Sequence, residues 1–136
     1  MNKPCKDCGS VTRKVTPPGP RCATCHRERR KAARQAAHEL RVGKVYGLKP
    51  GQYEELYEAQ GGVCYICRRA SGKTKRLAVD HDHKTGYVRG LLCGPCNKIL
   101  GHLRDDPDTS LRVWIYLVTP PAFDVIGKVK PDEPQR

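Results

Sequence analysis

The sequence predicts a small α+β protein that is held together by two zinc ions. Three features of the chain support this prediction. The eight cysteines form four Cys-x-x-Cys pairs, at 5/8, 22/25, 64/67 and 93/96. Two short apolar runs, 77–80 and 87–92, are typical of β-strands and flank a turn at 84–86. Other stretches have helical periodicity, among them residues 26–41, which contain neither Gly nor Pro.

The composition explains why metals are expected. A chain of 136 residues with 38% hydrophobic residues, one Trp and one Phe cannot bury a large apolar core. Small proteins of this kind are usually stabilised by disulfides or metals. Repeated Cys-x-x-Cys spacing favours zinc, because two residues between thiolates let one turn present both sulfurs to one ion. No signal peptide and no apolar run of about 18 residues is recognisable, so we expect a reducing, cytoplasmic location.

The chain is strongly basic, with a formal net charge of +12 at pH 7. Two zinc ions, each held by four thiolates, would contribute about −2 apiece and lower the total to roughly +8. A positive net charge of this size favours a polyanionic partner, of which nucleic acid is the simplest. The alternative is a solvated basic surface that aids solubility.

Residues 1–25 form the first predicted zinc module, a zinc ribbon or knuckle in which 13 residues separate the two cysteine pairs. Four thiolates complete a tetrahedral site, so we interpret His26 as a neighbour of the site and not as a ligand that replaces a cysteine. The predicted ligands of this structural zinc are Cys5, Cys8, Cys22 and Cys25.

Residues 26–48 are interpreted as a basic helix and a linker. The helix is expected over 26–41, and Gly43 and Gly47 are expected to loosen the chain beyond it. Its alanine stripe is narrow, so the helix is better suited to lying along a phosphate backbone than to packing in a core. The alternative is an exposed linker helix without a partner. The predicted DNA contacts are Arg27, Arg30, Lys31 and Arg34.

The second predicted domain, residues 49–118, begins with a helix over 49–60 and ends with a helix over 107–118. Pro50 suits a first helical position. The Pro-containing tail, 119–136, is expected to be irregular. Three residues at helical spacing are interpreted as core side chains that pack against the second zinc module: Tyr53, Leu56 and Tyr57.

The centre of this domain has the order strand, turn, strand, helix, with the helix predicted over 95–100. Two cysteine pairs, separated by 25 residues, flank it. A closed site of four cysteines is structural, because no coordination position stays open for water. The predicted ligands of the second structural zinc are Cys64, Cys67, Cys93 and Cys96.

The run Asp-His-Asp-His at 80–83 lies between these cysteine pairs. Asp80 ends the first strand, and Asn97 begins a helix that Cys96 anchors to zinc, so the zinc can bring Asp80 and Asn97 into one small space. Carboxylate and amide oxygens suit Mg²⁺ and leave positions for water and phosphate. His81 alternates away from Asp80 along the strand, and a neutral His near pH 7 is a suitable general base for water.

The chain resembles the recombination endonuclease VII family of phage and phage-like nucleases. The resemblance lies in Val-Asp-His-Asp-His-Lys-Thr-Gly at 79–86, Val-Arg-Gly-Leu-Leu-Cys at 88–93 and Cys-Asn at 96–97. It extends over roughly residues 46–118 and leaves the N-terminal zinc module outside. The family is part of the HNH, or His-Me finger, superfamily, so the resemblance implies a ββα-metal core built on the second zinc module.

The resemblance also implies residue roles in the hydrolysis of DNA phosphodiester bonds to 5′-phosphate and 3′-hydroxyl ends. Asp80 and Asn97 would bind a catalytic Mg²⁺, for which Mn²⁺ can substitute. His81 would activate the attacking water, and His83 would contact the scissile phosphate. Arg89 is a further candidate phosphate contact, the alternative being a charge on the strand surface.

Two positions depart from the family pattern. A His two residues before the metal-binding Asp is replaced by Ala78, and a Glu three residues after the Asn is replaced by Leu100. The base and the metal ligands are retained, but the substrate is left open. We expect a DNA endonuclease in the cytoplasm of a bacterial host, selective for branched DNA such as Holliday junctions. Because resolving a junction needs two symmetric cuts, a junction-resolving enzyme would be a homodimer. The alternatives are a monomeric nicking or sequence-directed HNH endonuclease and a non-catalytic zinc-ribbon DNA-binding protein.

Overall fold

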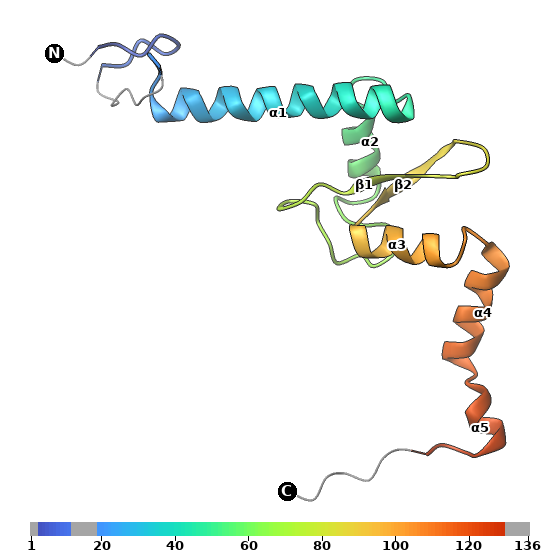
Figure 1. Ribbon diagram of the computed structural model, residues 1–136. Coiled ribbons are helices and arrows are strands. Elements are labelled where there is room, and N and C mark those ends of the chain that lie inside the picture. The colour runs from blue at the N-terminus through green and yellow to red at the C-terminus, as the bar shows by residue number, and fades with distance from the viewer. Residues whose placement is uncertain (1–2, 12–18, 130–136) are drawn as a thin grey trace, which may run out of the picture. The chain divides into compact units, whose positions relative to one another are not determined.

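The computed structural model describes residues 3–11 and 19–129 and shows a small α+β protein with two clusters of four cysteines (Figure 1). The chain divides into two compact units, Met1–Gly62 and Val63–Arg136. Over the described ranges, no helix combines the length and the apolar character that crossing a membrane requires. The elements are α1 (Ala23–Tyr46), α2 (Gln52–Ala59), β1 (Ala78–His81), β2 (Val88–Leu92), α3 (Gly94–His102), α4 (Pro107–Val118) and α5 (Pro121–Val125).

Helix α1 is longer at both ends than the predicted helix over 26–41. It continues through Gly43 and ends at Gly47, which has a left-handed φ of 72° and whose N–H donates to the Gly43 carbonyl at 3.0 Å. The expectation that Gly43 loosens the chain is wrong. A Cβ at Gly43 would lie 3.0 Å from the Leu48 carbonyl oxygen, so glycine lets the chain turn back closely against the helix.

Helix α2 begins at Gln52, two residues after Pro50, the predicted first helical position. Gly51 adopts a left-handed φ of 86°, which interrupts the helical backbone directly after the proline. The Gln52 side-chain oxygen accepts from the Lys49 N–H at 2.8 Å and so satisfies a donor at this helix end.

Tyr53 is buried, as predicted, with 4% of its surface exposed, whereas Leu56 and Tyr57, predicted to be core residues with it, are half-buried. The packing of Tyr53 against the second zinc module stays a prediction, because the ring contact that the structure shows is with α1. Its ring contacts His38 of α1 edge-on, with the ring centroids 4.5 Å apart. The Gln35 side-chain amide donates to Glu39 and Glu54 at 3.1 Å and also joins the two helices. In this unit, the ring of Tyr53 and the side chain of Gln35 therefore hold α2 against α1.

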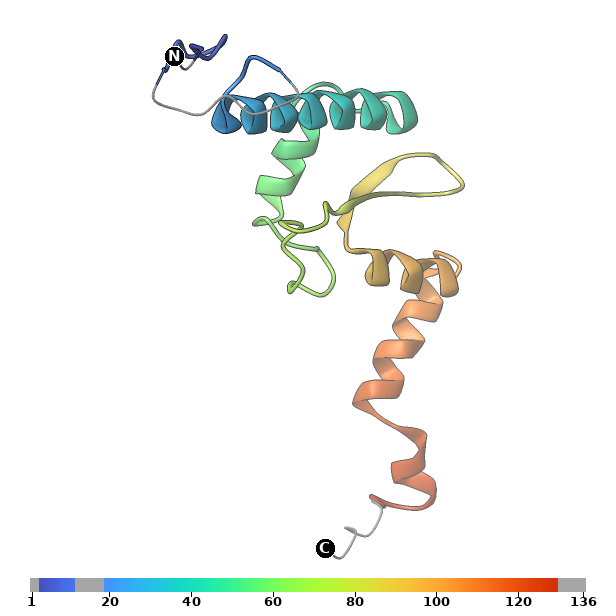
Figure 2. The ribbon, with the colours of Figure 1, turned by 60° about the vertical axis from the view of Figure 1, so that its left-hand side comes forward.

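The second unit is built on an antiparallel hairpin of β1 and β2. Ala78 pairs with Leu92 and Asp80 with Gly90. Helix α3 packs against β1, as Figures 1 and 2 show, and reaches two residues beyond the predicted 95–100. The small apolar core of this unit consists of Leu77, Val79, Leu91, Leu92 and the cysteines Cys64 and Cys96.

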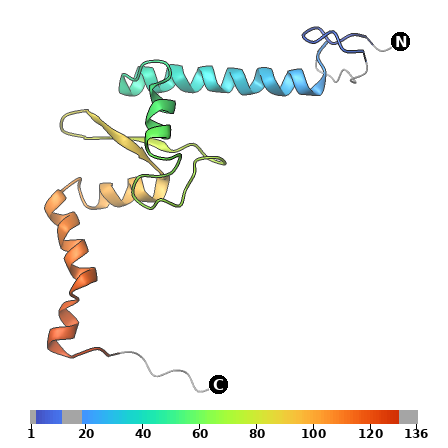
Figure 3. The same cartoon turned by 180° about the vertical axis from the view of Figure 1, so that it is seen from behind.

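Helix α4 spans the predicted residues 107–118. The side chain of Asp106 caps it by accepting from the N–H groups of Asp108 and Thr109 at 3.2 and 3.0 Å. Figure 3 shows α4 and then α5 running on from the end of α3. Part of the tail predicted to be irregular is therefore helical, and residues 130–136 of that tail lie outside the described residues.

Candidate active site and metal centres

The second cysteine cluster has the geometry of a zinc site. The four sulfur atoms lie within 4.8 Å of one another, and Cys67 Sγ is 3.9 Å from Cys93 Sγ. Tetrahedral zinc with Zn–S bonds of about 2.3 Å separates its sulfurs by about 3.8 Å. A disulfide would need about 2.05 Å. The predicted ligands Cys64, Cys67, Cys93 and Cys96 therefore fit structural zinc.

Backbone hydrogen bonds favour the thiolate form of Cys67, whereas burial raises the pKa of Cys96 in the same cluster to about 12. The Cys64 N–H donates to the Ala70 carbonyl at 2.8 Å and so closes the turn around Cys67. The N–H groups of Ala70 and Arg69 lower the pKa of the Cys67 thiol to about 6. Because zinc binds thiolates, a lowered thiol pKa reduces the cost of releasing the proton at neutral pH.

The N-terminal cluster has the same character. Its sulfurs also lie within 4.8 Å of one another, and Cys8 Sγ is 3.9 Å from Cys22 Sγ. The Cys22 N–H donates to Cys5 Sγ at 3.2 Å, and this bond is the main reason that the pKa of Cys5 is lowered to about 6. His26 is not among the clustered ligand atoms, in agreement with its interpretation as a neighbour. The ligands are Cys5, Cys8, Cys22 and Cys25.

A β-bulge sets the surroundings of Asp80. The pairing of β1 with β2 shifts between Asp80 and His81, so Arg89 stands as an extra residue between their partners on β2. Arg89 turns its guanidinium onto the buried Asp80 carboxylate, with Nε–Oδ2 at 2.7 Å and NH2–Oδ1 at 3.0 Å. Asp80 is thus buried as half of a two-bonded ion pair.

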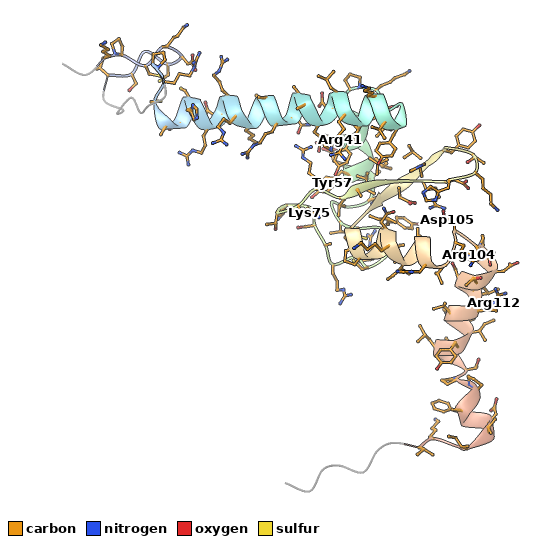
Figure 4. The ribbon with its side chains drawn as sticks, in the orientation of Figure 1. Arg41, Tyr57, Lys75, Arg104, Asp105 and Arg112 are labelled. Atoms are coloured by element: carbon orange, nitrogen blue, oxygen red, sulfur yellow. The ribbon has the colours of Figure 1, made fainter. Side chains whose placement is uncertain are left out.

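Asp105 extends this pair into a network that the sequence did not predict. It lies between α3 and α4 (Figure 4), accepts from Arg89 NH2 at 2.8 Å, and bonds to His83 Nδ1 at 2.6 Å. The hydrogen bond from Arg89, followed by that from His83, lowers the pKa of Asp105. One continuous set of contacts therefore connects Asp80, Arg89, Asp105 and His83.

The two predicted histidines lie together at one end of the hairpin. The rings of His81 and His83 meet edge-on, with centroids 4.9 Å apart. The loop that carries them is shaped by Asp82, whose Oδ1 accepts from the N–H groups of Lys84 and Thr85 at 2.7 and 2.9 Å. The N–H donors of Thr85 and Lys84 lower the pKa of Asp82, so this turn keeps its charged acceptor at neutral pH.

Asn97 lies directly after Cys96 in the first turn of α3, the helix that packs on β1. Its side chain is half-buried. The hydrogen-bonded network described above does not include Asn97, so its partnership with Asp80 stays a prediction. On α1, the predicted DNA contacts are all exposed: Arg27, Arg30, Lys31 and Arg34.

A cavity of about 320 Å³ lies beside the network. Asp80, Arg89 and Asp105 form part of its wall, and Leu100, at one of the positions that depart from the family pattern, forms another part. The position of Asp105 in this wall depends on backbone torsions that no sequence motif reveals. Arg104 and Asp105 both have positive φ, 55° and 54°, in the connection after α3.

Comparison with known proteins identifies relatives. A family model described as recombination endonuclease VII matches residues 39–119. The chain is 54% identical over 131 residues to the Gene 59 protein of Mycobacterium phage L5, covering 93% of this chain and 80% of that protein. It is also 54% identical over 131 residues to the Gene 59 protein of Mycobacterium phage D29, covering 93% of this chain and 79% of that protein. No solved structure matches.

Proposed function

Because the chain belongs to the recombination endonuclease VII family, we propose that it is a Mg²⁺-dependent DNA endonuclease with an HNH-type, ββα-metal active site. The family indicates a phage nuclease and hence DNA as its partner. The observation that best supports the finer assignment is the order β1, β2, α3, with the buried carboxylate of Asp80 beside the bulge that leads to His81. A carboxylate and two imidazoles then lie at one end of one hairpin.

The proposed metal ligands, Asp80 and Asn97, fit Mg²⁺, because this ion prefers carboxylate and amide oxygens and keeps several waters. Arg89 already donates to both oxygens of Asp80. A carboxylate offers about four lone-pair sites, so the two bonds from Arg89 leave acceptor capacity for an ion. When bound, the ion would stabilise negative charge on the phosphate and on the departing 3′-oxygen. Mn²⁺ suits the same donors.

The histidines have different proposed roles. His81 takes a proton from the water that attacks the phosphorus, which leaves 5′-phosphate and 3′-hydroxyl ends. His83 contacts the scissile phosphate. Its Nδ1 is bonded to Asp105, so a protonated His83 ring has its Nε2–H left to donate to a phosphate oxygen. Arg89 donates hydrogen bonds to Asp80, a proposed metal ligand, and to Asp105, the partner of His83, and so orients both carboxylates.

The substitution His81→Ala tests this assignment. Loss of a general base lowers rates by roughly 10²–10⁴-fold, so we expect cleavage of supercoiled plasmid, linear duplex and four-way junction to fall by at least about 100-fold with Mg²⁺. DNA affinity should stay close to that of the wild type, because His81 acts on water. The matched control is His102→Ala, which removes an exposed His at the end of α3 and should retain cleavage and binding.

Two other results would decide between functions. If His81→Ala loses DNA binding together with cleavage, the catalytic role of His81 is wrong. If the wild-type protein binds all three DNAs but cuts none, the protein is a non-catalytic DNA-binding protein.

The substrate we propose is branched DNA such as a Holliday junction. Its resolution needs two symmetric cuts and so a homodimer. One observation favours this version over a monomeric nicking enzyme: α4 exposes every residue from Leu111 to Val118, and most of them are large and apolar. Such a surface is unusual for a monomer. Cleavage products from a junction labelled on two opposing strands would distinguish paired cuts from single nicks.

A further inference from the structure

The segment that connects the second zinc module to β1 is unusually basic. We call residues 68–76 the basic loop. No Asp or Glu occurs between Glu58 and Asp80. The basic loop therefore has only positive charges, and its five basic side chains are exposed: Arg68, Arg69, Lys73, Lys75 and Arg76.

The basic loop forms one wall of a groove of about 420 Å³. The groove is also lined by Cys93 and by Gly94 and Pro95 at the start of α3. The cations that line the groove are Arg69, Lys75 and Arg76, and none of the described residues that line it is acidic. Figure 4 shows Lys75 on this loop, at the other end of the hairpin from Asp105.

The backbone around the groove is held in place at both ends. At its start, the Arg68 N–H donates to the Cys64 carbonyl at 3.0 Å, and Ala70 accepts from the Cys64 N–H at 2.8 Å. At its end, Leu77 is buried, with 3% of its surface exposed. The basic loop is therefore anchored by the zinc module at its start and by the core of the hairpin at its end.

The zinc centre alone does not account for so many cations. Four thiolates and one Zn²⁺ carry a net charge of about −2. Against the three cations that line the groove this leaves a surplus of roughly +1, and all five cations of the basic loop together leave a surplus of roughly +3. Like charges that line one groove repel one another, so a polyanion that binds there is favoured.

We propose that this groove binds a backbone phosphate of the DNA substrate, about three base pairs from the phosphate that is cut. The proposal rests on the proposed function. Leu77, which lines the groove and directly precedes β1, is three residues from Asp80, or about 10 Å at roughly 3.3 Å per residue of extended chain. This matches about three base-pair rises of roughly 3.4 Å. The groove thus fixes the register of the duplex on the active site and contributes affinity without reading sequence.

The test combines Arg69→Ala with Lys75→Ala in the full-length protein, in a His81→Ala background that does not cut. Binding to labelled duplex is measured across a range of salt concentrations. Each lost phosphate contact lowers the slope of log K against log salt by about 0.9. Because both side chains line a groove that binds one phosphate, we expect the double substitution to reduce that slope by about 1 and to weaken binding by about tenfold or more. The charge-matched control, Lys44→Ala with Lys128→Ala, should change the slope by less than half as much.

A second measurement uses the protein with its groove intact. In the DNA, a neutral methylphosphonate replaces the phosphate three base pairs from the cut. It should lower the DNA affinity of the protein with the intact groove and should not change the affinity of the groove variant, which lacks Arg69 and Lys75. Equal effects of the methylphosphonate on both proteins would overturn the proposal, even if the variant were less stable. If the groove variant contains its zinc and still shows the wild-type salt slope, the groove proposal is also overturned. Cleavage of DNA by the wild type would then leave the proposed function standing. If the wild type neither binds nor cleaves DNA, the proposed function itself fails.

Discussion

Asp105 shows how much of the site depends on one side chain with no recognisable motif. Its carboxylate contacts His83 on one oxygen and Arg89 on the other. The hydrogen bond from Arg89, with the contribution of His83, lowers its pKa from the ordinary value of 3.8. The stabilisation is therefore fully present above that ordinary value and is lost only as the pH falls through the lowered pKa. At neutral pH, Asp105 is a charged acceptor that orients His83.

We predict that Asp105 is a positioning residue for His83 and not a catalytic residue. Asp105→Ala should lower the rate of DNA cleavage by about tenfold to a hundredfold, as is common for residues that orient a functional histidine. Asp105→Asn should recover part of that loss, because an amide oxygen can still accept from Nδ1–H.

The readout specific to positioning is the ¹⁵N chemical shift of the His83 ring. The Nδ1 signal should be that of a nitrogen hydrogen-bonded to a carboxylate in the wild type and should lose that signature in Asp105→Ala. Asp124→Ala, at an exposed Asp in α5, is the control and should change neither the shift nor the rate. If the His83 Nδ1 signal is the same in Asp105→Ala as in the wild type, Asp105 does not position the ring.

At the scale of elements, zinc stabilises parts that are too short to be stable alone. β1 has four residues and β2 has five, and an isolated two-stranded hairpin is marginal in water. Cys93 follows β2 directly, and Cys96 lies in the first turn of α3. The metal can therefore join the end of the hairpin to the helix that packs on β1, which is the arrangement that the proposed site needs.

We predict that the two zinc ions stabilise the two units separately. The double substitution Cys64→Ser with Cys96→Ser should release one zinc per chain and abolish hydrogen-exchange protection across residues 63–104. The reason is that metal binding supplies folding free energy directly. Protection in the middle of α1 should persist.

The matched variant is Cys5→Ser with Cys22→Ser, which should release the other zinc and leave β1 and β2 protected. Exchange mass spectrometry and zinc content measure both effects. Protection of β1 that survives the loss of the second zinc would show that the hairpin does not need the metal.

The elements that the sequence predicted well have strong local signals. The strands and α4 lie within about a residue of their predicted bounds, because apolar alternation and Pro107 mark them. The misses have non-local causes. Helix α1 continues through Gly43, where the Leu48 carbonyl approaches the helix closely, and Arg89 meets Asp80 because of a bulge in the strand pairing. Asp105 enters the site through two consecutive left-handed residues, a conformation that sequence patterns do not indicate.

At the scale of the whole molecule, the most conspicuous surface lies on α4 and α5. We define the α4–α5 apolar surface by its exposed large apolar residues: Leu111, Val113, Trp114, Ile115, Tyr116, Leu117, Val118, Phe123 and Val125. A helix that is apolar around most of its circumference is normally covered by another element. Three aromatic residues in this set can each bury roughly 150–250 Å². With the aliphatic residues, the surface can supply the area of about 800 Å² per partner that a standard interface buries.

We predict that a second copy of the chain covers the α4–α5 apolar surface. A symmetric pair uses the same surface twice, which suits a substrate that needs two symmetric cuts. Trp114→Ser combined with Leu117→Ser removes two side chains that are 60% and 71% exposed. The wild type should sediment as a dimer and the variant as a monomer. On a four-way junction, the variant should change the products from paired cuts to single nicks.

The control for this prediction is Tyr87→Ser, which removes an aromatic side chain that is 77% exposed but lies outside the surface, at the hairpin turn. It should remain dimeric and should still make paired cuts, because exposed apolar area elsewhere does not hold the dimer. A wild-type protein that sediments as a monomer at micromolar concentrations and still cleaves DNA would contradict the dimer. That result would favour the nicking enzyme, since one active site acting alone can cut only one strand at each encounter.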